Sequence, residues 1–139
     1  MKKLLYGLLI AASASIFVVQ AKAQVIVIAN PSVKASDVSK NDLKDVFTGA
    51  STSLDGGSVV PILLKAGTAH EEFLQAYIGK NDTAYRAGWR SLVFSGQATM
   101  PKSLDGDGAV VDFVAHNPGA IGYIGKASPH DGVKVLAVK

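Results

Sequence analysis

The chain has 139 residues, enough for one ordinary globular domain. It has no cysteine, which excludes disulfide scaffolds, cysteine-ligated metal centres and thiol nucleophiles. Basic residues outnumber acidic ones by 14 to 11, a balance that raises the question of a nucleic-acid partner.

The first 23 residues have the three-part pattern of a secretory signal peptide. Lys2 and Lys3 give a positive start, an uncharged and mostly apolar run follows, and Ala21-Lys22-Ala23 supplies small residues at alternate positions. The alternative is a membrane anchor, but polar residues interrupt the run and no positive cluster follows it. We therefore predict cleavage after Ala23, giving a periplasmic or secreted chain that does not insert into the membrane.

The excess positive charge lies in this leader. Without Lys2, Lys3 and Lys22 the 14 basic side chains fall to 11, equal to the 11 acidic ones. A neutral domain lacks the electrostatic footprint that nucleic-acid binding requires, so we predict no nucleic-acid partner.

After the leader, the β-branched run at 25–29 predicts a strand buried on both faces. Ser39, with Asp42 three residues later, predicts the start of a helix that ends at Gly49. Residues 51–58 predict a polar turn and residues 59–64 a second strand. Within that strand, Pro61 indicates a sheet edge or a strand start.

The second half contains three predicted helices and two predicted strands. The first helix opens at Gly67-Thr68 and closes at Gly79; the second is capped by Asn81 or Asp82 and stops at Gly96. A short third helix lies around 109–114, a loop through residue 101 precedes it, and strands follow at 120–124 and 133–138. The alternation of strands and helices predicts one α/β domain. The apolar stripe of the second helix comprises Tyr85, Trp89, Leu92 and Val93, whereas Arg86, Arg90 and Lys102 are expected in solvent.

The sequence carries no recognisable catalytic or metal motif. His70, His116 and His130 are far apart and lack metal-ligand spacing. There is no Gly-x-Ser-x-Gly elbow, no Walker pattern and no dinucleotide-binding glycine pattern. We therefore predict a protein that is not an enzyme and that has no catalytic residues, metal or cofactor.

One segment predicts a binding site. A strand ends at Lys65, Gly67 permits a tight turn, and a helix begins at Thr68 or Ala69. The first turn of a helix leaves backbone N–H groups unpaired, and its dipole favours an anion. With the Thr68 hydroxyl and the Lys65 charge, these groups would form an oxyanion cradle. The alternative is that Thr68 only caps the helix and Lys65 is solvated.

A second polar stretch contains Thr48, Ser51, Thr52 and Ser53. Thr48 and Ser51 would add uncharged donors to the same pocket. The alternative for this stretch is a hydrophilic turn.

Six stretches in a fixed order span nearly all of residues 24–139. They are 28–31, 43–49, 60–62, 67–68 with 72–73, 89–96 and 117–124. The most specific are Phe47-Thr48-Gly49 and Asn117-Pro118-Gly119-Ala120-Ile121-Gly122-Tyr123-Ile124. In this order they resemble the exported phosphate-binding proteins that serve ABC transporters, and specifically a family of short domains like one lobe of a periplasmic binding protein (PBP-like domains).

The resemblance implies a single PBP-like lobe at residues 24–139, with a small mixed sheet flanked by helices. It implies that residues 66–69 donate to a bound phosphate or similar oxyanion. The larger relatives close two lobes on the ligand, so a second copy or another partner would supply the other wall, and an ABC transporter permease is an expected partner. The alternative function is a non-catalytic accessory or interaction protein that keeps the fold without binding a ligand tightly.

Overall fold

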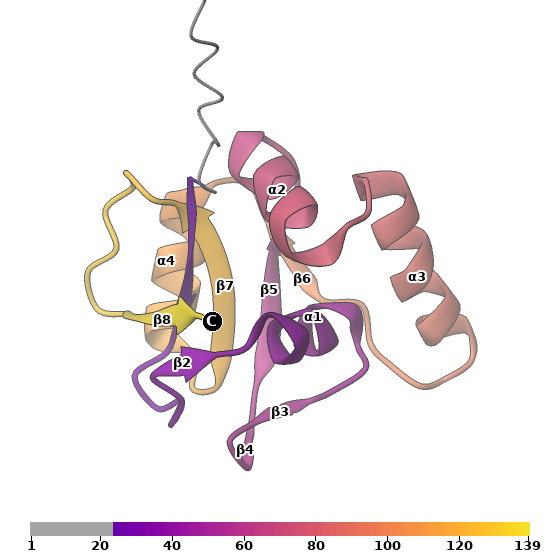
Figure 1. Ribbon diagram of the computed structural model, residues 1–139, viewed down its shortest axis with the longest axis horizontal. Helices are drawn as coiled ribbons and strands as arrows, with labels where there is room; N and C mark the ends of the chain where they lie inside the picture. The colour runs from indigo at the N-terminus through magenta and orange to yellow at the C-terminus, as the bar shows by residue number, and fades with distance from the viewer. Residues whose placement is uncertain (1–23) are drawn as a thin grey trace, which may run out of the picture.

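A computed structural model describes residues 24–139; the predicted signal peptide lies outside the described residues (Figure 1). Within this range none of the helices is long and apolar enough to cross a membrane. The strands are β1 Val25–Ala29, β2 Asp37–Val38, β3 Ser53–Leu54, β4 Gly57–Ser58, β5 Val60–Leu64, β6 Lys102–Leu104, β7 Ala120–Gly125 and β8 Lys134–Val138. The helices are α1 Lys40–Thr48, α2 Thr68–Phe73, a π-helix η1 Leu74–Ile78, α3 Asp82–Phe94 and α4 Asp107–His116.

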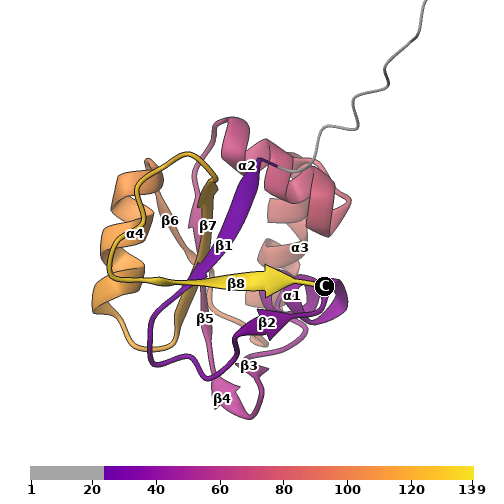
Figure 2. The same ribbon diagram turned by 60° about the vertical axis from the view of Figure 1, so that its left-hand side comes forward.

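Six strands form a mixed sheet in the order β2-β8-β1-β7-β5-β6 (Figures 1 and 2). β5, β6 and β7 run parallel to one another, whereas β1 is antiparallel to both of its neighbours, β7 and β8. Because helices link the parallel strands, the architecture is α/β, and the expected small mixed sheet flanked by helices is confirmed.

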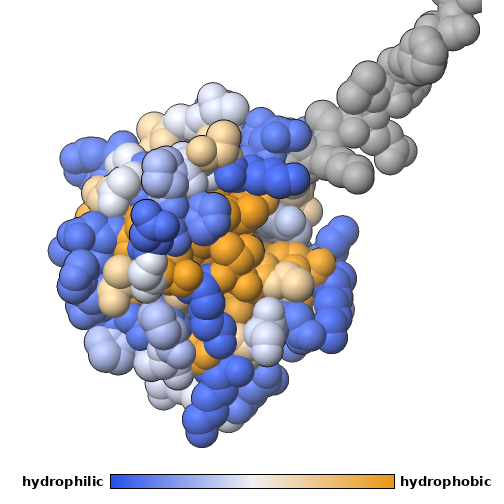
Figure 3. All heavy atoms as spheres, turned by 90° about the vertical axis from the view of Figure 1, so that its left-hand side faces the viewer, coloured by the Kyte–Doolittle hydropathy of each residue, from blue (hydrophilic) through white to orange (hydrophobic). Residues whose placement is uncertain are grey.

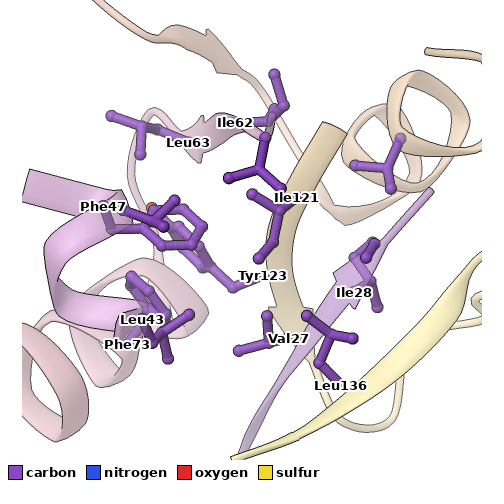
Figure 4. Close-up of a cluster of buried hydrophobic side chains, with 14 of the residues drawn as sticks. Val27, Ile28, Leu43, Phe47, Ile62, Leu63, Phe73, Ile121, Tyr123 and Leu136 are labelled. Atoms are coloured by element: carbon purple, nitrogen blue, oxygen red, sulfur yellow. The ribbon is translucent and has the colours of Figure 1, made fainter. Parts of the chain in front are cut away.

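Helices cover both faces of the sheet, and two consecutive residues of β7, Gly122 and Tyr123, contact helices on opposite faces. Tyr123 points to one face, where its ring stacks on Phe73 of α2 at 3.9 Å between centroids. Phe47 of α1 meets the same two rings edge-on (Figure 4). All three side chains are fully buried, so this aromatic cluster forms the centre of the core on the α1–α2 side.

Gly122 faces the opposite side, where α4 packs. A Cβ atom at this position would lie 2.9 Å from Cγ1 of Val110 and 3.4 Å from Cγ2 of Val114. The missing side chain therefore allows α4 to approach the sheet closely.

Two helix starts follow the sequence prediction. Ser39 Oγ accepts a hydrogen bond from the Asp42 amide at 3.0 Å, and α1 ends at Gly49 in the left-handed region with φ 84°. Asn81 Oδ1 accepts from the Ala84 amide at 2.9 Å, so Asn81 caps α3 and Asp82 is its first residue. These caps depend on residues within one turn, which is why the sequence specifies them.

Other elements differ from the prediction. The predicted turn at 51–58 contains the hairpin β3–β4, and the predicted loop after residue 100 contains β6. Pro61 lies in an interior strand, but β6 pairs with β5 only from Ile62 onward. The strand-start interpretation of this proline therefore holds and the edge interpretation is wrong. Val93 is 40% exposed, so the buried stripe of α3 is narrower than predicted.

Candidate functional site

The carboxyl ends of β5 and β6 define a switch point in the sheet. The two strands are parallel neighbours, so both end at the same edge. The helix after β5 is α2, which packs on the Tyr123 face, and the helix after β6 is α4, which packs on the Gly122 face. In open α/β sheets, ligands bind where successive connections leave to opposite faces in this way.

Both helices that start at this point lack a side-chain cap. The N-cap of α2 is Gly67, with φ 105°, and the N-cap of α4 is Gly106. By contrast, Ser39 and Asn81 cap α1 and α3. Since Gly67 is the cap of α2, the alternative in which Thr68 caps this helix is wrong, and the first-turn amides of α2 have no capping oxygen from their own cap residue.

Four of the predicted site residues lie together in the loop from Lys65 to Ala69, here called the 65–69 loop. Gly67 and Thr68 are exposed, and Ala69 is half-buried at the helix start. Lys65 is exposed as well, and its ammonium group lies 3.1 Å from Asp105, which follows β6. This ion pair spans the switch point.

Thr48 and Ser51 lie elsewhere. The Thr48 hydroxyl donates to the Lys44 carbonyl within α1 at 2.7 Å. Ser51 lines a cavity of about 390 Å³ together with Val60 and Pro61, at the start of β5. The 65–69 loop follows the other end of this five-residue strand, about 16 Å away at 3.3 Å per residue. A role for Thr48 and Ser51 in binding an anion stays a prediction, and it would require a ligand at the other end of β5.

Beneath the 65–69 loop lies a chain of hydrogen bonds that the sequence analysis missed. His70 is 1% exposed. Its Nδ1 contacts the Tyr123 hydroxyl, and its Nε2 lies 2.7 Å from Oδ1 of Asp82. Asp82 in turn accepts from Nε of Arg86 at 2.8 Å. We call Tyr123, His70, Asp82 and Arg86 the buried clamp.

The Leu64 amide limits how protons can be placed in this chain of hydrogen bonds. It donates to the Tyr123 oxygen at 3.1 Å, which leaves the Tyr123 hydroxyl able to donate its own proton to Nδ1 of His70. In the tautomer that accepts this proton, Nε2 of His70 carries the ring proton and donates it to Asp82.

Of the two acidic groups in the clamp, the Tyr123 hydroxyl stays neutral and the Asp82 carboxyl is ionised. Burial raises the pKa of Tyr123, which keeps its hydroxyl protonated. For Asp82, burial opposes ionisation, but the hydrogen bond with His70 and the charge of Arg86 outweigh it and lower the pKa of this carboxyl. Asp82 also lines a cavity of about 670 Å³ beside η1, so the carboxylate end of the clamp reaches the surface.

Arg86 corrects one expectation of the sequence analysis, which placed it in solvent. Its side chain is only 18% exposed. Nη2 donates to the carbonyls of Leu64 and Lys65 at 3.3 and 3.0 Å, and Nη1 donates to Ser103 Oγ of β6 at 3.4 Å. The spacing of Asp82 and Arg86, four residues apart on a helix, is the local signal that would have revealed their ion pair.

The order hydroxyl, imidazole, carboxylate is also that of a hydrolytic triad. Here the hydroxyl belongs to Tyr123, which is fully buried and cannot reach a substrate. The chain of hydrogen bonds therefore offers no nucleophile to a substrate at Tyr123. Within residues 24–139 no three histidine or acidic side chains are grouped as a metal site would need.

The sequence matches no protein-family model and no curated protein. The structure, however, is similar to solved structures of phosphate transport proteins. One, from Clostridium perfringens, is described as a phosphate ABC transporter substrate-binding protein with bound phosphate; it has 21% identity and a TM-score of 0.62 over 83% of this chain and 44% of its own. PstS from Borrelia burgdorferi has 17% identity and a TM-score of 0.59 over 84% of this chain and 47% of its own.

An ABC-type phosphate transport receptor from Vibrio cholerae has 14% identity and a TM-score of 0.56 over 83% of this chain and 46% of its own. The chain thus spans less than half the length of the structures it matches. The resemblance expected from the sequence motifs is confirmed at the level of the fold: the chain has the α/β fold of less than half of each of these solved structures, as expected of a single lobe.

Proposed function

We propose that this chain is an exported solute-binding module that captures phosphate or a similar oxyanion at the 65–69 loop. The observation that carries the proposal is the place of this loop. It lies at the switch point between β5 and β6, where α2 begins without a side-chain cap. The fold it belongs to is shared with proteins named for phosphate transport, and one of them was solved with bound phosphate.

The chemistry of the loop suits an oxyanion. The amides of Thr68 and Ala69 open α2, and the helix dipole adds positive potential there. Gly67 has no Cβ, so a ligand can approach its backbone closely. Room for the ligand is available, since no atom lies within 4 Å of the place a Cβ would take. Lys65 would turn from Asp105 to the ligand, and this costs little because their side chains are 58% and 86% exposed.

Capture would be non-covalent, without catalysis and without a cofactor. Export would follow cleavage after Ala23 and release the module into the periplasm or the medium. An ABC transporter permease would receive the ligand. Because the structural relatives are more than twice as long as the matched region, a second copy of this chain or another protein would supply the opposite wall.

Isothermal titration of residues 24–139 with phosphate, sulfate and vanadate tests the proposal. We expect a phosphate Kd in the micromolar to millimolar range, since a site with one wall leaves the ligand partly hydrated. Lys65→Ala and Thr68→Ala should each weaken binding. The matched controls Lys44→Ala and Thr83→Ala change the same residue types at exposed sites on other helices and should bind as the unmodified chain does. No heat at millimolar phosphate would refute the proposal.

An accessory role is the second candidate function. Figure 3 shows apolar side chains gathered on the face that carries β8. Val135 of β8 is 44% exposed, and Val133, just before this strand, is only partly buried. Apolar surface of this kind favours contact with another protein. Association in sedimentation velocity that Val135→Lys abolishes, in a chain that binds no anion, would support this candidate over the first.

A further inference from the structure

We propose that the buried clamp is a positioning device that holds the 65–69 loop in the conformation that receives the oxyanion. The proposal rests on the proposed function of this loop. It assigns to Arg86 and His70 a role without contact to the ligand: they act through the backbone that precedes the loop and the helix turn that follows it.

The residue before the loop is attached to both ends of the clamp. The Leu64 amide donates to the Tyr123 hydroxyl, and the Leu64 carbonyl accepts from Arg86. The carbonyl of Lys65, the first residue of the loop, also accepts from Arg86. Both polar groups of the strand end are thereby fixed to side chains that are themselves hydrogen-bonded.

The residue after the loop is part of the clamp. His70 follows Ala69 directly, and its ring is held between Tyr123 and Asp82. The loop is therefore bracketed by two positions tied to one network. Two backbone hydrogen bonds also hold the loop: the Lys65 amide donates to the Leu104 carbonyl at 2.9 Å, and the Gly67 carbonyl accepts from the Glu71 amide at 3.0 Å. The Lys65–Asp105 pair is exposed and contributes little, and Gly67 has no side chain to restrict it. To these restraints the clamp adds side-chain hydrogen bonds to the backbone of Leu64 and Lys65.

Such restriction raises affinity because a loop already in its bound conformation loses less entropy on binding. The guanidinium group is essential to the device. It contacts Asp82, two backbone carbonyls and Ser103 from one planar group. A lysine ammonium carries the same charge on a single nitrogen and cannot span these acceptors. Arg86→Lys therefore removes the positioning and keeps the charge.

The experiment compares Arg86→Lys with Arg90→Lys in residues 24–139, the segment that contains the whole described sheet and core. Arg90 lies one turn further along α3, is exposed, and provides the matched control. Amide hydrogen exchange is measured at Lys65 and Glu71, whose amides donate to the carbonyls of Leu104 and Gly67 at 2.9 and 3.0 Å, and, as a reference for global unfolding, at Tyr123 and Ile124. Phosphate affinity is measured by titration on the same samples.

We expect exchange at Lys65 and Glu71 to accelerate about tenfold in Arg86→Lys relative to the reference amides, and phosphate affinity to fall about tenfold. Arg90→Lys should change neither quantity. Equal acceleration at the loop and at the reference amides would show a purely structural role and overturn the proposal. If Arg86→Lys does not fold, Asp82→Asn, which removes the carboxylate that orients Arg86, is measured in the same way.

The two proposals fail in different ways. If the unmodified chain binds phosphate and Arg86→Lys binds it equally well, the positioning role is wrong and the proposed function stands. If the unmodified chain binds no phosphate, the proposed function fails and the positioning role for an oxyanion fails with it. The exchange data then report only whether Arg86 restricts the motion of the loop.

Discussion

His70 and Asp82 are joined by a hydrogen bond of 2.7 Å between Nε2 and Oδ1. This contact links the first turn of α2 to the first residue of α3, and through Tyr123 it reaches the centre of the sheet. A surface carboxylate is thus connected to a fully buried hydroxyl by one imidazole ring. The stability of the fold and the shape of the 65–69 loop depend on the same side chains.

The first prediction concerns the energetic coupling inside the clamp. Tyr123→Phe leaves the Leu64 amide and Nδ1 of His70 without their partner, and His70→Phe leaves the Tyr123 hydroxyl without its acceptor. Each single change should lower the free energy of unfolding by about 1–3 kcal/mol. The double variant should lose less than the sum by at least about 0.5 kcal/mol, measured by urea denaturation. Additive losses would mean that the two side chains act independently.

Asp82 makes the free energy of unfolding depend on pH in the acidic range. Its pKa in the folded chain lies below the ordinary value of 3.8. The unfolded chain therefore takes up this proton first as the pH falls, so the stabilisation is present above about pH 4 and is lost below it. Denaturation midpoints measured from about pH 6 to pH 3 should fall more steeply for the unmodified chain than for Asp82→Asn. Parallel curves would contradict the assignment.

Because the Tyr85 hydroxyl is buried, we predict that the free energy of unfolding falls at alkaline pH. Burial raises its pKa from 10.0 to about 12, although the hydrogen bond with Trp89 and the charge of Arg86 oppose the shift. The unfolded chain ionises first as the pH rises, so this contribution is intact below pH 10 and is lost between pH 10 and about 12. Tyrosinate absorbance and circular dichroism should therefore change together. Tyr85→Phe should reduce this alkaline loss, and an unaltered curve would count against the burial argument.

Two glycines test the packing of α4 against the sheet. Gly122→Ala should lower the free energy of unfolding by about 1–3 kcal/mol, because the added Cβ meets Val110 at 2.9 Å. Gly88→Ala, the matched control inside α3, meets nothing within 4 Å and should raise it by about 0.5–1 kcal/mol. Denaturation curves that shift in the same direction for both variants would contradict the close approach at Gly122.

The sequence predicted the elements whose signals are local. The strand at 25–29, the Ser39 and Asn81 caps and the end of α1 at Gly49 each depend on residues within a few positions of one another. The strand β6 was missed because three residues after a proline carry no periodicity; only pairing with β5 makes them a strand.

The candidate site likewise has one part that local sequence signals predict and one part that they do not. The 65–69 loop was found because a strand end, a glycine and a helix start follow one another in the chain. The clamp was missed because its contacts join residues 53 and 12 positions apart, and no spacing rule connects His70 to Tyr123 or to Asp82. Tertiary structure alone brings these groups together.

The most direct test is a two-dimensional ¹H–¹⁵N nuclear magnetic resonance titration of residues 24–139 with phosphate. If the 65–69 loop captures the oxyanion, the amide signals of Gly67, Thr68 and Ala69 shift and reach at least half of their full change by about 1 mM phosphate, which corresponds to a binding free energy of about −4 kcal/mol or stronger. Signals that stay in place at these three amides up to about 10 mM phosphate would contradict the assignment of this loop as the oxyanion site.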